Sequence, residues 1–367
     1  MILLNTLANV QSTGYGGASN NLALALLGRG VNCRTALLPG ERANVHIYFG
    51  QLYDAHLEHP SCSERRADIL AVFTMYESSA LPQDWVDKMN KMFDLVLVPS
   101  TWCAESFKAC GVTKPIAVVP LGFNPHEWPV IKRPVLPNKL FTYYWQGFKD
   151  VKDRKGGNLV QAAFEDLRRC GDIPANDTRL IMKSVPLLIS SMTQDARVDY
   201  ELFDTRTIIK SIAQHELIEL LREADVSFNP ASGEGFGLIP LEHMATGTPV
   251  FAPYATGMTE YLVDGTYFPL KTKMMDAIIC DPSYERMGQI PRPYYDDVRE
   301  KMLWAYDHRD ELADVGIRGA NHIRSKYTYA HTAIALINAL NIHCGYDEFN
   351  TWVAPEPERQ TVREYSI

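Results

Sequence analysis

The sequence predicts an α/β protein with two Rossmann-like, doubly wound domains that face a cleft. The chain has 367 residues, and at roughly 100–200 residues per domain this length suggests two domains. In both halves, apolar strand-like runs alternate with helical patterns, which is typical of parallel sheets covered by helices. A polar stretch with several prolines lies between the halves and predicts a linker over residues 129–139.

The first half begins with a short strand, a glycine turn and a helix. Ile2–Leu4 is the apolar strand, residues 14–17 form a flexible Gly-Tyr-Gly-Gly turn, and Ala18–Leu27 has helical spacing. Further strands are expected at 43–49, 69–75, 95–99 and 116–120, and helices at 83–92 and 104–110. These elements make up a first domain over residues 1–128.

The alternation restarts near Phe141 and predicts a second domain over residues 140–329. Its strands are expected at 141–145, 179–183, 207–209, 225–229 and 249–252, and its helices at 158–169, 215–223, 240–245 and 299–306. A helix at 330–340 and a polar tail complete residues 330–367, and we expect this segment to pack back toward the first domain.

Composition makes several function classes less favoured. The net charge is −8 and no run of Lys or Arg exceeds two residues, which argues against a nucleic acid as the favoured partner. Seven scattered cysteines without a Cys-x-x-Cys pair predict neither a disulfide framework nor a zinc site. No apolar stretch approaches the roughly 20 residues of a membrane span, and the start lacks a signal-peptide pattern. We therefore expect a cytoplasmic protein.

A glycine-rich turn between a strand and a helix is the most informative stretch. It reads Asn229-Pro-Ala-Ser-Gly-Glu234-Gly-Phe-Gly-Leu-Ile-Pro240-Leu-Glu242. Its backbone N–H groups and the positive end of the helix form a site for an anion or for sugar hydroxyls. Glu234 and Glu242 flank the turn, and carboxylates accept hydrogen bonds from vicinal hydroxyls. A capping glutamate and an ordinary solvated one are the structural alternative.

This constellation resembles the signature of retaining glycosyltransferase family 4, which has the GT-B fold. The resemblance rests on the Glu-x7-Glu motif, which spans Glu234 and Glu242 in the pattern E-G-F-G-L-x-x-L-E-x-M-A-x-G-T-P-V. Further similar segments are Gly14–Gly17, Val98–Ser100, Val118–Gly122, Arg154–Gly156 and Lys326–Tyr329. They follow the family's order over residues 1–340.

The resemblance implies a role for each residue of the turn. Glu242 is expected to bind the donor ribose, and Glu234 the donor sugar. The sugar and diphosphate would be held by the backbone of Gly235, Phe236, Gly237 and Leu238. Gly16 and Gly17 would let the first domain's backbone approach the phosphate from across the cleft.

Basic residues of the second domain are expected to meet the diphosphate. Lys155 fits the family's lysine, Lys149 stands where the family more often has arginine, and Arg154 is a nearby substitute. A solvated basic loop is the structural alternative for these three residues. Since the chain contains no Asp-x-Asp motif, these cations and not a metal are expected to stabilise the leaving group. No cofactor is expected beyond the nucleotide sugar.

Glu77 is a further candidate in the first domain. It closes a predicted strand within Met75-Tyr-Glu-Ser78, a segment similar to that of some of these transferases. Its side chain would touch the acceptor or the donor sugar. A helix cap or a buried hydrogen-bond partner is an equal alternative.

The resemblance implies a metal-independent, retaining transfer of a hexose or related sugar from a nucleotide sugar to a hydroxyl acceptor. UDP is favoured over GDP in the donor, and a glycan or envelope component is the leading acceptor. Three alternatives stay open: a nucleotide-sugar epimerase or phosphorylase, a transferase acting on a modified nucleic-acid base, and a non-catalytic sugar-nucleotide binder.

Overall fold

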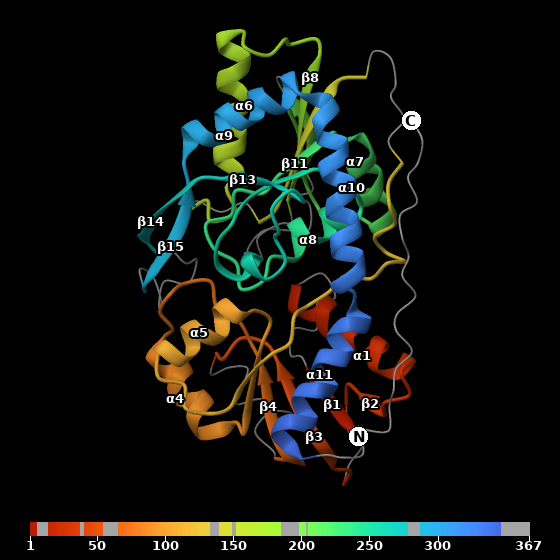
Figure 1. Cartoon of the computed structure of the whole chain (residues 1–367), viewed down its shortest axis with the longest axis vertical. Helices are drawn as coiled ribbons and strands as arrows, with labels where there is room; N and C mark the ends of the chain where they lie inside the picture. The colour runs from red at the N-terminus through yellow and green to blue at the C-terminus, as the bar shows by residue number, and fades with distance from the viewer. Residues whose placement is uncertain are drawn as a thin grey trace. The chain divides into compact units, whose positions relative to one another are not determined.

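The computed structural model describes residues 1–5, 14–36, 40–53, 65–132, 139–148, 152–184, 198–202, 205–277 and 287–345. The described chain divides into two compact units. Unit 1 contains residues 1–124 and, among the described residues that follow unit 2, residues 326–345. Unit 2 contains residues 125–325. Each unit has its own parallel sheet with helices, as Figure 1 shows.

Unit 1 is built on a six-stranded, all-parallel sheet in the order β2-β1-β3-β4-β5-β6. Its strands are β1 (Ile2–Asn5), β2 (Cys33–Arg34), β3 (Ala43–Phe49), β4 (Ala67–Phe73), β5 (Leu95–Val98) and β6 (Ile116–Val118). Its helices are α1 (Gly14–Gly28), α4 (Gln83–Met92), α5 (Thr101–Ala109) and α11 (Tyr329–Cys344). Strands β3 to β5 are apolar and mostly buried, as expected for a covered sheet.

A tight crossing attaches the last helix to unit 1. The backbone N–H of Phe123 donates to the carbonyl oxygen of Tyr327 at 2.9 Å, and the N–H of Tyr329 donates to that of Phe123 at 3.2 Å. A Cβ on Gly122 would stand 2.4 Å from the carbonyl carbon of Thr328, so only glycine fits there. Helix α11 then packs against α1 (Figure 1).

Unit 2 is built on a seven-stranded sheet in the order β13-β12-β11-β7-β8-β10-β9, in which β9 alone is antiparallel to its neighbour. Its strands are β7 (Phe141–Gln146), β8 (Thr178–Ser184), β9 (Val198–Leu202), β10 (Thr205–Ile209), β11 (Val226–Phe228), β12 (Val250–Pro253) and β13 (Phe268–Leu270). Its helices are α6 (Gly157–Cys170), α7 (Gln214–Glu223), α8 (Leu238–Ala245), η1 (Thr256–Glu260), α9 (Tyr295–Asp307) and α10 (Arg309–Lys326). The predicted pair of Rossmann-like domains is therefore confirmed.

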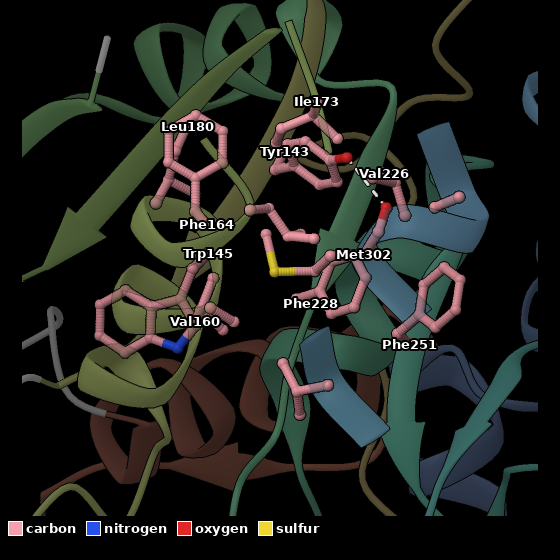
Figure 2. Packing of buried hydrophobic residues seen from close by; sticks show 14 of the residues in the cluster. Tyr143, Trp145, Val160, Phe164, Ile173, Leu180, Val226, Phe228, Phe251 and Met302 are labelled. Carbon is pink, nitrogen blue, oxygen red and sulfur yellow. Dashed lines mark hydrogen bonds between the residues drawn. The ribbon is translucent and has the colours of Figure 1, made fainter. Parts of the chain in front are cut away.

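Central strand β7 organises the core of unit 2. Tyr143 and Trp145 are fully buried, and the Tyr143 hydroxyl donates to the carbonyl oxygen of Met302 on α9 at 2.9 Å (Figure 2). Phe164 of α6 packs edge-on against Tyr143, and Phe228 of β11 lies beside it. The aromatic run at 143–145 is thus core, as its strand pattern predicts, and it holds β7 and β11 rigidly beneath their C-terminal loops.

Several elements differ from the sequence prediction: the short strands β2, β9 and β13 and the 3₁₀ helix η1 were not expected. Helix α1 begins at Gly14 and not at Ala18, because the glycines of the expected turn take up helical geometry. Helix α10 and a hairpin of β14 (Thr272–Asp276) and β15 (Gln289–Pro293) are additional. Glycines at 316 and 319 interrupt the helical pattern of α10, yet they let the helix approach the 247–249 turn closely: a Cβ on Gly316 would lie 2.4 Å from the Gly247 oxygen.

Residues 125–132, which are the end of the predicted first domain and the start of the predicted linker, belong to unit 2. Trp128 and Ile131 are each only 5% exposed, and the Ile131 N–H donates to the Thr246 oxygen at 2.9 Å. The change of unit falls between residues 124 and 125, a few residues before the expected boundary, because these two apolar side chains are buried in unit 2. Residues 133–138 lie outside the described residues.

Candidate functional site

Three loops meet at the C-terminal edge of the central strands of unit 2. They follow β7, β11 and β12, which are neighbours in the sheet. A Cβ on Gly156 would stand 2.5 Å from the Pro230 oxygen, and a Cβ on Gly257 would stand 2.0 Å from the Gly235 oxygen. The loops therefore touch backbone to backbone, and glycine is required at both contacts. This edge is where open α/β sheets bind ligands.

Glu234 lies on the loop after β11, and its backbone is hydrogen-bonded to the loop after β12. Its N–H donates to the hydroxyl of Thr256 at 3.1 Å, and its carbonyl oxygen accepts from the N–H of Gly257 at 2.8 Å. Thr256 has a φ of +51°, which is rare for a β-branched residue and costs conformational energy. This loop therefore fixes where the Glu234 carboxylate points.

The Glu234 carboxylate lies between two cations from the β7–α6 loop. It accepts a short hydrogen bond from the ammonium of Lys155, and the Arg154 guanidinium stands 4.0 Å from its other oxygen. Only 12% of the Glu234 side chain is exposed, so these charges interact with little screening. The predicted donor residues Lys155, Arg154 and Glu234 thus lie together.

Both cations are positioned by backbone contacts. The Trp145 indole N–H donates to the Lys155 carbonyl oxygen at 3.0 Å. The Arg154 guanidinium donates to the Gly233 oxygen at 2.7 Å, and the Ser232 N–H donates back to the Arg154 oxygen at 2.7 Å. Lys149 lies outside the described residues, so its predicted role stays a prediction.

The turn at 235–238 leads directly into α8. Gly237 has a φ of +89° and its carbonyl oxygen accepts from the Tyr261 hydroxyl at 2.8 Å. A Cβ there would meet Met258 at 2.7 Å, so the position excludes other residues. No side chain caps the N-terminus of α8 among the described residues. The helix end therefore presents backbone N–H groups to an anion or hydroxyl.

Glu242 is partly buried on α8. Burial first, and then the negative charge of Glu127, raise the pKa of its carboxyl to about 8. Its side chain makes no hydrogen bond to any residue that the structure describes. A buried carboxyl without protein partners is suited to accept hydrogen bonds from a ligand, which is consistent with the role that the resemblance implies.

The next residue, His243, points away from Glu242 into the protein, as the helical spacing predicts. Its Nδ1 lies 2.8 Å from the Ser227 hydroxyl, and its Nε2 lies 3.2 Å from the side-chain oxygen of Gln146. The Asn229 amide donates to the same Ser227 hydroxyl at 3.0 Å. This buried network joins α8 to the ends of β7 and β11 beneath the turn.

The candidates of the first half lie together in unit 1. Gly16 and Gly17 stand in the first turn of α1, beside Tyr15. The Tyr15 hydroxyl accepts from the Met75 N–H at 3.3 Å, two residues before Glu77. Burial, and secondly the charge of Glu77, raise the pKa of Tyr15 well above its usual range. The roles predicted for Gly16, Gly17 and Glu77 stay predictions.

Thr256, Gly257 and Tyr261 are site residues that the sequence did not indicate. All three follow β12, within eight residues of its end, and none belongs to the Glu-x7-Glu turn. Their signal is tertiary: they contact Glu234 or Gly237 only after β11 and β12 pair. A Thr-Gly pair after an apolar strand gives no hint of that contact.

A family model supports the location of this site. Residues 193–283, which contain the turn, match the model of the glycosyl transferases group 1. The matched residues all belong to unit 2.

Two relatives that match parts of the chain are both named as glycosyltransferases. D-inositol 3-phosphate glycosyltransferase of Stackebrandtia nassauensis is 41% identical over 71 residues, which is 19% of this chain and 16% of the relative. The enzyme of that name from Nocardia farcinica is 26% identical over 185 residues, 49% of this chain and 36% of the relative. The matched parts thus span little more than a third of these relatives at most.

Solved structures share the whole fold. Anabaena HepE, solved in complex with UDP and glucose, superposes with a TM-score of 0.65 at 12% identity and covers 93% of this chain and 100% of HepE. At that identity the likeness concerns the fold alone, which is GT-B.

The described residues include no group of three or more His, Cys, Asp or Glu side chains that could hold a metal ion. Within the same residues, no helix is long and apolar enough to cross a membrane.

Proposed function

We propose that the chain is a retaining glycosyltransferase of family 4 that moves a hexose or related sugar from a nucleotide sugar to a hydroxyl acceptor. The observation that carries this proposal is the Glu234 carboxylate, ion-paired with Lys155 at a glycine turn that opens α8. The group 1 region that contains the turn supports it. The relatives named as glycosyltransferases agree with it.

Each group at the turn has a role in donor binding. The Glu234 carboxylate accepts hydrogen bonds from the donor sugar's hydroxyls, and Glu242 accepts them from the ribose. Lys155 offers a positive charge to the diphosphate, and the N–H groups of 235–238 bind its oxygens or the sugar. As the bond to the sugar breaks, negative charge grows on the diphosphate, and these preorganised groups stabilise it.

Metal independence and UDP preference are part of the proposal. Lys155 and Arg154, both less than a fifth exposed, supply positive charge where a metal would otherwise act. A fold neighbour that binds UDP and glucose supports UDP over GDP. The acceptor is a hydroxyl compound, with a glycan or envelope component preferred to a nucleic acid, because the chain's net charge is −8.

Thermal shifts test the donor site. Wild type is heated with UDP, GDP, ADP and their hexose conjugates, with and without EDTA. We expect the largest stabilisation with a UDP conjugate, no effect of EDTA, and a much smaller shift for Glu242→Ala. Glu219→Ala, which removes an exposed carboxylate of α7, serves as the control and should respond as wild type does.

Product analysis separates the proposal from its alternatives. A transferase releases UDP from UDP-hexose in step with glycosylation of an acceptor, whereas an epimerase yields an altered nucleotide sugar without any acceptor. Stabilisation by no nucleotide at all would overturn the proposed donor site. Binding without UDP release, over a broad set of acceptors, would favour a non-catalytic binder.

A further inference from the structure

The β14–β15 hairpin lies beside the loops that follow β7 and β11. It is inserted between β13 and α9 and stands at the edge of unit 2 (Figure 1). Met275 and Ile290 lie directly opposite each other in the hairpin and line a small cavity. Arg154 and Ser232 line the same cavity from the other side. The hairpin is therefore a neighbour of the loops that hold Glu234.

Arg292 extends from the hairpin into this region. It lies on the same face as Ile290, because side chains two apart on a strand share a face. It lines the cavity together with Arg154 and Lys152, and it is partly buried. Its guanidinium makes no hydrogen bond or ion pair with any residue that the structure describes.

The charges around Arg292 are unfavourable without a ligand. Its direct cross-strand partner is Lys273, and like charges directly opposite each other destabilise a strand pair. Asp276 is the acidic residue that lines the cavity, and it already accepts a hydrogen bond from Gln289 at 2.5 Å. A partly buried guanidinium without an acceptor also loses hydration. An oxyanion would remove both costs.

We propose that Arg292, with Arg154 beside it, forms a subsite that binds a phosphate group of a substrate. A guanidinium presents paired N–H donors that fit two phosphate oxygens, and a second arginine lining the same cavity adds positive charge. The subsite deepens the proposed function and rests on it for the identity of the substrate. The phosphate comes either from the donor diphosphate or from a phosphorylated acceptor.

Binding to four forms of the full chain tests the subsite: wild type, Arg292→Gln, Arg292→Lys and the control Arg222→Gln. The control removes an arginine of α7 that is paired with Glu219 on the surface. Calorimetric titrations use uridine, UDP and pyrophosphate, and steady-state assays compare glucose 6-phosphate with glucose as acceptors of UDP-glucose. Melting curves show that each variant is folded. Arg292→Gln should melt no lower than wild type, because it removes a like-charge pair.

If the donor supplies the phosphate, Arg292→Gln weakens UDP and pyrophosphate by about tenfold, as expected for one charge-assisted contact, and leaves uridine unchanged. If the acceptor supplies it, UDP affinity is unchanged and the KM for glucose 6-phosphate rises about tenfold, with no change for glucose. Arg292→Lys should fall between wild type and Arg292→Gln in either case.

The subsite would be overturned if Arg292→Gln kept the wild-type dissociation constants for UDP and pyrophosphate and the wild-type KM for glucose 6-phosphate. That result would leave the proposed function standing if wild type binds UDP and Glu242→Ala does not. Conversely, pyrophosphate binding that depends on Arg292, in a chain that binds no nucleotide, would support the subsite and contradict the proposed function.

Discussion

At the scale of single residues, the candidate site depends on two glutamates in different surroundings. Glu234 is ion-paired with Lys155 and anchored through its backbone to residues 256 and 257. Glu242 is partly buried and makes no hydrogen bond within the described part of the chain. One carboxylate is therefore preorganised by the protein, and the other is left for the ligand to satisfy.

Glu242 gives the stability of the chain a pH dependence. Burial raises its pKa from 4.5 to about 8 in the folded state, so the folded state binds its proton more tightly than the unfolded state does. Its contribution to stability is complete below about pH 4.5 and is lost as the pH rises toward 8. Glu242→Gln cannot titrate, so its stability relative to wild type should increase between those pH values, by about 1.4 kcal/mol for each pH unit.

Denaturant unfolding at pH 5, 6, 7 and 8 measures this difference. Glu219→Gln, at an exposed position of α7, should show no such trend. If the free energies of unfolding of Glu242→Gln and wild type differ by the same amount at every pH in this range, the pKa of the Glu242 carboxyl is not raised.

Thr256 has a strained backbone, and its hydroxyl helps to position Glu234. Thr256→Gly removes the strain of a threonine at φ +51°, which is worth about 1–3 kcal/mol, but it also removes the hydroxyl that accepts from the Glu234 N–H. We expect Thr256→Gly to unfold within about 1 kcal/mol of wild type and to release UDP from UDP-hexose about tenfold more slowly. Thr256→Ser keeps the hydroxyl and should keep the rate. Equal rates in both variants would mean that the hydroxyl does not position the carboxylate.

At the scale of elements, the site is a contact between loops. Gly257, the second residue of the short helix η1, lies against the turn before α8, and a Cβ on it would stand 2.0 Å from the Gly235 oxygen. Gly257→Ala should push the turn away, lower the stability by about 1–3 kcal/mol and abolish the thermal shift with UDP conjugates. Gly28→Ala is the control, because a Cβ there meets no atom within 4 Å. Normal donor binding by Gly257→Ala would contradict this account of the turn.

At the scale of the whole molecule, unit 1 depends on a helix that follows unit 2 in the chain. Helix α11 packs against α1 and buries apolar residues such as Leu336 and Leu340. A chain that ends at Ser325 loses this helix. We expect hydrogen exchange to show lost protection in β1 and β3 to β5, with protection kept in β7 and β11. A chain that ends at Gly345 keeps α11 and should keep protection in both units. Full protection of unit 1 in the shorter chain would contradict the dependence of unit 1 on α11.

Most of the architecture was predictable because its signals are local. The strands of both sheets are apolar runs, and the Glu-x7-Glu turn carries its glycines and Pro240 in one short stretch. The hairpin was not predictable, since β14 is largely exposed and lacks an apolar face. Helix α10 was missed because Gly316 and Gly319 weaken its pattern, and their reason for being glycine lies in a contact with residues 247 and 266.

The sequence by itself determined the two Rossmann-like domains, the glycine turn and the pair of glutamates, because strand periodicity and turn chemistry act between near neighbours in the chain. The tertiary structure alone decided what surrounds Glu234: Lys155, 79 residues earlier, Thr256, 22 residues later, and the hairpin with Arg292 beyond. Sheet pairing brings these residues to one edge, and no local pattern records which loops it will join. The desolvation that raises the pKa of Glu242 likewise arises only when the folded chain closes around it.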